Sequence, residues 1–247
     1  MALDQVTFSV GRGETIGLIG PNGAGKTTLF NCVTGVLRSE GGDVWFGLER
    51  RHSLTGLAPH QIARYGITRT FQNIRLFAST TVLENVLVGT YVRTRTGLWG
   101  AVLLDSEARR EERWARERAM ELLEFVGLAP RAGDVAGALP FGLQRRLEIA
   151  RALSADPTLL LLDEPAAGLN PVEKQQLLQL IAQLKAKGLT LVLIEHDMQV
   201  VMPISDRVVV LDYGKNIAEG PPRTVQADPR VIEAYLGAAT HVAPGRN

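Results

Sequence analysis

The segment Gly20-Pro21-Asn22-Gly23-Ala24-Gly25-Lys26-Thr27 identifies the architecture of this 247-residue chain. It matches the pattern G-x-x-x-x-G-K-S/T, whose glycines let the backbone curl until successive N–H groups point at one anion. Residues 14–19 before it are typical of a strand, and the residues after it, up to about 34, are typical of a helix. A strand, a glycine-rich loop and a helix in this order predict a nucleoside-triphosphate site.

The side chains at the end of this loop suit a magnesium nucleotide. Lys26 can reach the β- and γ-phosphates, and the Thr27 hydroxyl can hold Mg²⁺. The start of the following helix adds its partial positive charge to the phosphate site. The residues predicted to bind the nucleotide are Asn22, Gly23, Gly25, Lys26, Thr27 and Thr28.

An acidic pair follows a run of four leucines, Leu159–Leu162. A continuous apolar run is typical of a buried parallel strand, and ligands of open α/β sheets gather at the C-terminal ends of such strands. We expect Asp163 to hold Mg²⁺ through water and Glu164 to orient or deprotonate the attacking water. The alternative, two solvated carboxylates at a strand end, leaves the phosphate loop without the acidic partner that its chemistry needs.

After residue 156 the sequence alternates between strand-like and helix-like segments. Such alternation predicts a parallel sheet covered by helices on both faces. Between about residues 81 and 153 the apolar periodicity is helical, and the small, polar residues 237–247 predict a mobile tail. The expected strands are 5–10, 14–19, 44–46, 159–162, 190–194 and 207–211, and the other expected helices are about 26–34, 59–65, 171–187 and 198–204.

The composition is that of a folded domain and excludes disorder, with 45% hydrophobic and 21% charged residues. Lys and Arg total 27 and Asp and Glu total 26, so the formal net charge of +1 argues against a nucleic-acid binder. The apolar runs are too short to cross a bilayer, and residues 1–10 lack the features of a signal peptide. Cys32 is the only cysteine, which is compatible with a reducing cytoplasm.

Two polar segments each leave a structural and a functional interpretation open. Glu107–Arg118 contains four acidic and five basic residues, which indicates a solvated helix face or a helix facing a partner, such as anionic lipid. Asn170-Pro171-Val172-Glu173 predicts a helix start, with Asn170 as N-cap and Glu173 reaching back to it. A role at a partner interface is the alternative for this second segment.

The order of these motifs resembles that of the ATP-binding-cassette (ABC) ATPases over about residues 4–237. Gln72 stands at the position of the family's Q-loop, Leu139–Leu143 at its signature sequence and His196 at its switch histidine. Taken alone, Gln72 would be a polar loop residue and His196 a structural one. The strings Arg69–Phe77, Gln144–Arg151, Glu164–Pro171, Ile194–Met198 and Ala234–Gly237 look like the ATP-binding subunit of high-affinity branched-chain amino acid importers.

The resemblance implies one P-loop ABC ATPase domain over residues 1–247, in the α/β class. A mostly parallel core sheet with a small antiparallel β subdomain would occupy about 1–72 and 156–236, and a helical subdomain about 73–155. It also implies roles for single residues. Gln72 would contact Mg²⁺ and the attacking water, His196 would contact the γ-phosphate, and Gly142 would contact the ATP of the opposite protomer.

The resemblance further implies that two subunits close on two ATP molecules and that hydrolysis reopens them. The partners would be an identical or sister ATPase, two transmembrane permease subunits and, indirectly, an extracytoplasmic substrate-binding protein, with no nucleic acid. The protein would be cytoplasmic and peripheral on the inner face of the cell membrane, powering import of branched-chain or related amino acids.

Three other assignments stay open at this point. They are the ATPase of another ABC system such as lipopolysaccharide export, a soluble ABC protein of DNA repair or translation, and a weakly hydrolysing interaction module. The chain has no coiled-coil insertion, second cassette or basic excess, which argues against the soluble class.

Three departures from the family pattern affect these expectations. The family's signature is commonly Leu-Ser-Gly-Gly-Gln, whereas Pro140 here lacks a hydroxyl and an N–H, and Leu143 lacks an amide. We therefore expect weaker ATP-driven closure or slower hydrolysis. In the family, an aromatic residue that stacks on adenine usually precedes the strand aligned with Val6–Val10. The residues before that strand here, Met1-Ala2-Leu3-Asp4, include no aromatic residue. Either the true start lies upstream of Met1, or adenine is held without this stack. Asn170 stands where many relatives have Asp.

Overall fold

The computed structural model describes residues 2–47, 51–90 and 106–240. Its larger sheet has the strand order β4-β5-β6-β1-β7-β8, and β2 pairs with β3 in a two-stranded antiparallel sheet. The strands are β1 (Thr15–Ile19), β2 (Trp45–Phe46), β3 (His52–Ser53), β4 (Ile67–Arg69), β5 (Leu159–Asp163), β6 (Thr190–Ile194), β7 (Arg207–Asp212) and β8 (Lys215–Gly220).

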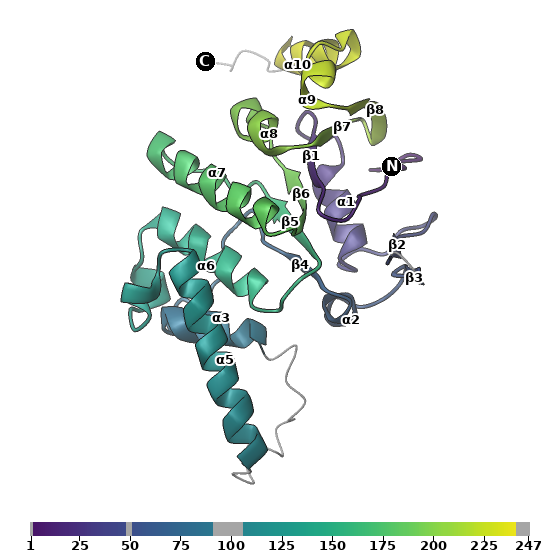
Figure 1. Cartoon of the computed structure of the whole chain (residues 1–247). Coiled ribbons are helices and arrows are strands. Elements are labelled where there is room, and N and C mark those ends of the chain that lie inside the picture. Colours follow the sequence, from purple (N-terminus) through teal and green to yellow (C-terminus); the bar gives the residue numbers. More distant parts are fainter. Residues whose placement is uncertain (1, 48–50, 91–105, 241–247) are drawn as a thin grey trace, which may run out of the picture.

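Helices follow most of these strands and cover both faces of the larger sheet (Figure 1). Two short 3₁₀ turns, Ala129–Arg131 and Ala136–Ala138, precede α6. The α-helices are α1 (Lys26–Val33), α2 (Pro59–Arg64), α3 (Val82–Thr90), α5 (Ser106–Phe125), α6 (Phe141–Leu153), α7 (Pro171–Ala186), α8 (Met198–Ile204), α9 (Pro222–Gln226) and α10 (Pro229–Thr240).

The leucine run shows why the central strands are continuously apolar. Strand β5 pairs in parallel with β4 and β6, so its side chains point alternately to the two faces of the sheet. Leu160 and Leu162 pack in the cluster that includes residues of α6 and α7, whereas Leu159 and Leu161 pack with Phe30 of α1. Both faces are therefore buried, as expected for a parallel sheet between helix layers.

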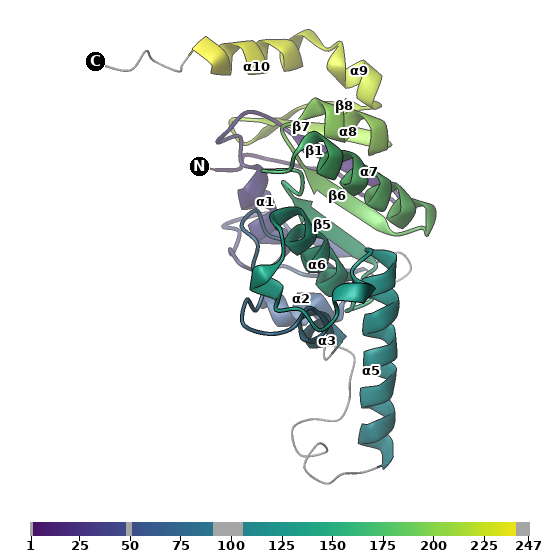
Figure 2. The same ribbon diagram turned by 90° about the vertical axis from the view of Figure 1, so that its left-hand side faces the viewer.

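The helical part of the chain is built from α3, α5 and α6, which contact one another. Figure 2 shows α5 extending away from the sheet. Ala115 and Ala119 of α5 are buried, while Glu112 and Arg116 are exposed, which supports the solvated-face interpretation of this charged segment. No helix in the described ranges combines the length and the apolar character needed to cross a membrane.

The expected strand at residues 5–10 is not formed. Val6, Phe8 and Val10 are half-buried against the cluster around α1, so the segment is extended with alternating exposure. A strand also needs a hydrogen-bonded neighbour, and no strand of the described residues pairs with this one. The alternation of apolar and polar residues correctly indicated an extended backbone, but it could not show that this segment has no neighbouring strand to pair with.

Three strands and two helices were not expected from the sequence, among them the two-residue strand β3. Strand β4 is too short to show a periodicity. Strand β8 contains Asn216 and Gly220 but pairs with β7 through a two-residue turn in which Tyr213 and Gly214 both have positive φ, 42° and 78°. Helices α9 and α10 were also not expected.

The C-terminal end of the chain corrects one expected boundary. Helix α10 continues to Thr240, so residues 237–240 are helical rather than part of an irregular tail. Residues 241–247 of the predicted mobile tail, and residues 91–105 of the expected helical region, lie outside the described residues.

Candidate functional site

Four segments that carry polar residues meet at one edge of the larger sheet. The phosphate loop follows β1, residues 70–72 follow β4, the acidic pair ends β5, and residues 195–196 follow β6. These strands are parallel, and β4, β5, β6 and β1 are consecutive neighbours, so their C-terminal ends lie side by side. This edge is where open α/β sheets bind ligands.

The phosphate loop has the curled backbone that its glycines predict. Gly20, Gly23 and Gly25 have φ values of 150°, 83° and 101°, a region that other residues rarely adopt. A Cβ atom at Gly20 would lie 2.0 Å from the carbonyl oxygen of Leu211, so a side chain cannot fit there. Asn22, Gly23 and Thr27 are exposed, which leaves the outer side of the loop open to a ligand.

Lys26 lies within this loop rather than in solvent, with 6% of its surface exposed. Its Nζ donates to the carbonyl oxygens of Gly20 at 2.7 Å and Pro21 at 2.9 Å. Burial lowers the pKa of Lys26 below its usual value, while the negative charges of Glu164 and Asp163 act in the opposite direction. The ammonium group is therefore held by two neutral carbonyls at a place where an anion would stabilise it.

Asp163 is almost fully buried, yet only one of its two carboxylate oxygens is bonded. Oδ2 accepts a hydrogen bond from Nη2 of Arg69 at 2.6 Å. Oδ1 is buried and has no hydrogen-bond partner among the described residues. A free buried carboxylate oxygen is costly and is suited to a cation, so the donor chemistry fits Mg²⁺.

The rest of a magnesium shell would have to come from other oxygen donors. Within the described ranges, no group of three or more His, Cys, Asp or Glu residues could hold a metal. Mg²⁺ in nucleotide enzymes commonly takes one or two protein ligands and completes its shell with phosphate oxygens and water. The exposed Thr27 at the start of α1 and Gln72 after β4 are the other predicted ligands.

The three predicted catalytic residues come together from three different strands. Nε2 of Gln72 donates to Oε2 of Glu164 at 3.0 Å, and Nδ1 of His196 lies 3.9 Å from the same oxygen. Glu164 has a φ of 45°, an unusual conformation for a residue other than glycine, and its N–H donates to the oxygen of Ile194 at 3.0 Å. The structure places these side chains around one carboxylate; their chemical roles stay predictions.

The signature segment forms the start of α6. Pro140 is the N-cap, and in the described part of the chain the N–H groups of Phe141 and Gly142 have no hydrogen-bond partner, as is usual in a first helical turn. A Cβ atom at Gly142 would lie 2.4 Å from Oε1 of Glu173, so a larger residue there would have to displace this carboxylate. Leu143 is half-buried against the apolar cluster rather than presented to solvent.

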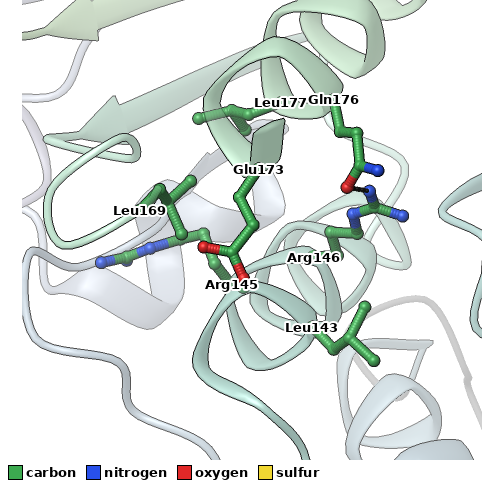
Figure 3. Close-up of a pocket in the computed structure, with 8 residues that line it drawn as sticks. Leu143, Arg145, Arg146, Leu169, Glu173, Gln176 and Leu177 are labelled. Atoms are coloured by element: carbon green, nitrogen blue, oxygen red, sulfur yellow. Dashed lines mark hydrogen bonds between the residues drawn. The ribbon is translucent and has the colours of Figure 1, made fainter. Parts of the chain in front are cut away.

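A small cavity separates this segment from α7 (Figure 3). Its volume of about 40 Å³ is well below the several hundred Å³ of typical ligand pockets, so it is not the nucleotide site. Asn170 and Glu173 form the expected reciprocal cap, in which each side chain accepts the other's N–H at 3.0 Å.

Buried polar residues that the sequence did not single out organise this site. Glu195 is buried and accepts the N–H of Ala166 at 2.8 Å, and burial raises its pKa. The hydroxyl of Tyr235 accepts the N–H of Gly20 at 3.0 Å across the whole length of the chain. The position of Glu195 directly after an apolar strand was a local signal. Tyr235 belongs to the string Ala234–Gly237, but nothing in that string indicated a contact with Gly20.

A buried ion pair on α6 holds the backbone of the Q-loop. Arg145 donates to the carbonyl oxygens of Phe71 at 2.8 Å and Gln72 at 2.9 Å, and it pairs with Glu148 at 2.7 Å. Glu148 in turn accepts the N–H of Phe71 at 3.1 Å. The contacts with residues 71 and 72 join segments far apart in sequence, and the pair of Arg145 and Glu148 lies within one helix. Residue type alone could therefore not identify these contacts.

Comparisons with known proteins agree with this geometry. Residues 3–167 match the family model described as ABC transporter, and residues 215–241 match that of the branched-chain amino acid ATP-binding cassette transporter. The chain is 48% identical over 240 residues to the high-affinity branched-chain amino acid transport ATP-binding protein LivG of Salmonella typhimurium, covering 97% of this chain and 93% of LivG. The corresponding protein BraF of Pseudomonas aeruginosa is 46% identical with the same coverage.

Solved structures of similar proteins have the same fold. The ADP conformation of an ATP-binding cassette of an ABC transporter superposes with a TM-score of 0.81 at 36% identity, covering 96% of this chain and 92% of that one. A dimeric post-hydrolysis cassette bound to ADP and Pi has a TM-score of 0.74 at 27% identity, covering 90% of this chain and 91% of that one.

Proposed function

Because this chain belongs to the ABC transporter family, we propose that it is the subunit that binds and hydrolyses ATP to power an importer of branched-chain or related amino acids. The observation that carries the hydrolytic part is the meeting of Gln72 and His196 at the carboxylate of Glu164, beside a phosphate loop. The substrate class is supported by the names of LivG and BraF and by the match of the C-terminal residues 215–241.

Each part of the site has a distinct task in this proposal. The curled main chain of residues 20–27 binds the phosphates, and Lys26 exchanges its two carbonyl partners for β- and γ-phosphate oxygens. Asp163, Thr27 and Gln72 would hold Mg²⁺, which neutralises phosphate charge when it is bound. Asn22, Gly23, Gly25 and Thr28 complete the contacts to the nucleotide.

Hydrolysis needs a group that orients the attacking water and takes its proton. Glu164 provides this group, because its N–H is bonded to the carbonyl oxygen of Ile194 at the strand end and its carboxylate is approached by two polar side chains. Gln72 now donates to Oε2 and would turn its amide to the water and the cation. His196, whose side chain is 57% exposed, is free to donate to a γ-phosphate oxygen.

A second copy of the chain, or a sister ATPase, would complete the site. The unpaired N–H groups at the start of α6 form a donor surface that suits the γ-phosphate of a nucleotide held by another subunit. Dimeric cassettes among the similar structures support this arrangement. Arg145 ties Gln72 to α6, so movement at the Q-loop would be passed to the helical subdomain of about residues 73–155 and from there to two permease subunits at the membrane.

Purified protein should test the hydrolytic function directly. Glu164→Gln should lower ATP turnover by about 10²-fold or more while ATP still binds, because the variant lacks only the proton acceptor. Lys26→Ala should abolish binding as well. Glu112→Gln on the exposed face of α5 is the matched control and should leave turnover unchanged. Unchanged turnover in Glu164→Gln would contradict the proposed role.

A weakly hydrolysing, nucleotide-dependent interaction module is the second candidate. Pro140 and Leu143 favour it, since both remove donors from the signature segment. Strong nucleotide binding without turnover by the unmodified chain would select this candidate.

A further inference from the structure

Arg69 connects three parts of the nucleotide site through one buried guanidinium. It ends β4, and only 6% of its side chain is exposed. Its Nη2 donates to Oδ2 of Asp163 at 2.6 Å, and its Nη1 donates to Oδ1 of Asn31 on α1 at 2.7 Å. The guanidinium also lies 5.3 Å from the ring centres of both Phe30 and Phe71.

These contacts fix the guanidinium on several sides. The two rings restrict it by stacking, and Asn31 anchors it to the helix that starts at the phosphate loop. Phe71 belongs to the segment that carries Gln72. The permanent positive charge of Arg69 is therefore held in place beside the predicted metal ligand.

The ion pair with Asp163 is incomplete. An arginine whose only purpose is to neutralise a carboxylate commonly contacts both oxygens in a fork. Here only Oδ2 is bonded, and both Oδ1 of Asp163 and Nε of Arg69 have no partner in the described part of the chain. One carboxylate oxygen thus accepts the hydrogen bond of Arg69, and the other is left for another ligand.

We propose that Arg69 is a positioning residue that serves as the counter-charge of Asp163 when no nucleotide is bound. It holds the carboxylate by Oδ2, leaves Oδ1 free and makes the nucleotide-free site a poor cation site. A divalent cation then binds only together with the phosphates, whose negative charge outweighs that of the guanidinium. This inference rests on the proposed magnesium-nucleotide function.

The electrostatics give this arrangement a measurable consequence. A divalent cation approaching Oδ1 is repelled by Arg69 and by the nearby ammonium of Lys26, which interacts electrostatically with Asp163. Nucleotide phosphates remove that repulsion, so nucleotide and cation bind cooperatively. Without Arg69 the carboxylate of Asp163 has lost its counter-charge and attracts a cation even when no nucleotide is present.

Binding of Mn²⁺ alone to the nucleotide-free protein tests this inference, followed by electron paramagnetic resonance. Arg69→Met should bind Mn²⁺ at least about tenfold more tightly than the unmodified chain, and adding Asp163→Asn should remove the gain. Arg69→Lys, which keeps the charge, should restore weak binding. Arg75→Met is the matched control, because Arg75 stacks on the same Phe71 ring at 4.5 Å but is exposed.

Binding of ADP in the presence of a chelator shows whether each variant is folded. A folded Arg69→Met protein with unchanged Mn²⁺ affinity would overturn the inference, because a purely structural arginine would change stability only. Should Arg69→Met not fold, Arg69→Gln, which can still donate to Asp163, makes the same test without the charge. Tight Mn²⁺ binding by the unmodified, nucleotide-free chain that is lost in Asp163→Asn would overturn it independently of any Arg69 variant.

The proposed metal site can fail separately. If Asp163→Asn leaves Mn²⁺ binding in the presence of ADP unchanged, Asp163 is not the metal ligand and the proposed function is at fault. If Asp163→Asn weakens that binding and Arg69→Met changes nothing, only the role of Arg69 is wrong.

Discussion

At the scale of single residues, Tyr235 illustrates how the end of the chain supports its beginning. Its hydroxyl accepts the N–H of the buried Gly20, the first glycine of the phosphate loop, and burial raises the pKa of this phenol. Gly20 has little room to move, since a Cβ atom built on it would lie 2.0 Å from the carbonyl oxygen of Leu211. The hydroxyl therefore satisfies a donor that local structure leaves open.

Tyr235→Phe should destabilise the fold by about 1–3 kcal/mol, because it leaves a buried main-chain N–H without a partner. Urea unfolding measures this change in the free energy of unfolding. Tyr213→Phe is the control and should have little effect, because Tyr213 is 81% exposed. Equal effects of the two substitutions would contradict the role of Tyr235.

The lowered pKa of Lys26 should couple nucleotide binding to protons. In the free protein burial lowers this pKa, so Lys26 loses its proton at a lower pH than an ordinary lysine, and phosphate contacts raise the pKa again. Binding should therefore take up protons, and affinity should fall, as pH rises through the lowered pKa. Calorimetry in buffers of different ionisation enthalpy measures the uptake. Lys26→Arg stays charged and should show none.

The same shift has a defined sign for the stability of the free protein. The unfolded chain holds more protons on this lysine than the folded chain between the lowered pKa and the ordinary value of 10.5. Its contribution to stability should therefore become more favourable as pH rises through that window. A contribution that falls with pH there would contradict the lowered pKa.

At the scale of elements, the important feature of α6 is its hold on the segment after β4. The buried pair of Arg145 and Glu148 replaces the strand partner that this loop lacks, through hydrogen bonds to the backbone of Phe71 and Gln72. These bonds link the helix that begins at the signature segment to the backbone of the Q-loop. Neither residue is close to the phosphate loop in sequence, yet both bond the segment that carries Gln72.

Arg145→Met should cost about 3–5 kcal/mol of stability, because it leaves the Glu148 carboxylate buried without its partner. Arg145→Met combined with Glu148→Leu should cost less than the sum of the single changes. Urea unfolding measures both. Arg146→Met is the neighbouring control, since Arg146 bonds the Gln176 side chain at the surface (Figure 3). A loss in Arg145→Met no larger than in Arg146→Met would show that the pair is not essential.

At the scale of the whole molecule, the chain presents its own phosphate loop at the sheet edge and its signature segment at the start of α6. Residues of α6 and of α1 pack in clusters on opposite faces of the sheet. Such an arrangement suits a pair of subunits in which each supplies the donors that the other lacks. We therefore expect Pro140 and Leu143, which depart from the common signature sequence, to affect the assembly of two subunits.

The double variant Pro140→Ser with Leu143→Gln should hydrolyse ATP faster, by up to about 10²-fold, and should dimerise more strongly with ATP, because it restores donors toward the γ-phosphate. Turnover and light scattering measure the two effects. Since Leu143 packs partly against the apolar cluster, the variant should also lose some stability. Pro140→Ala, which regains the N–H but not the hydroxyl, separates the two donors. Unchanged turnover and unchanged dimerisation would contradict the prediction.

Amino-acid order was sufficient where the relevant residues are neighbours along the chain. The phosphate loop, the leucine strand with its acidic pair and the cap formed by Asn170 and Glu173 all express local chemistry, in which residue type and spacing define the backbone conformation. The bounds of β6 were predicted without error for the same reason.

Folding alone selected the long-range partners. Arg69 meets Asp163, Tyr235 meets Gly20 and Arg145 meets Gln72 only because the strand order β4-β5-β6-β1 and the helices packed on it bring those segments together. Residues 5–10 show the converse, since their alternation is that of a strand but no neighbour pairs with them. Local patterns carry conformational preference, whereas a hydrogen bond or an ion pair requires two groups at one point in space, and that coincidence exists only in the packed molecule.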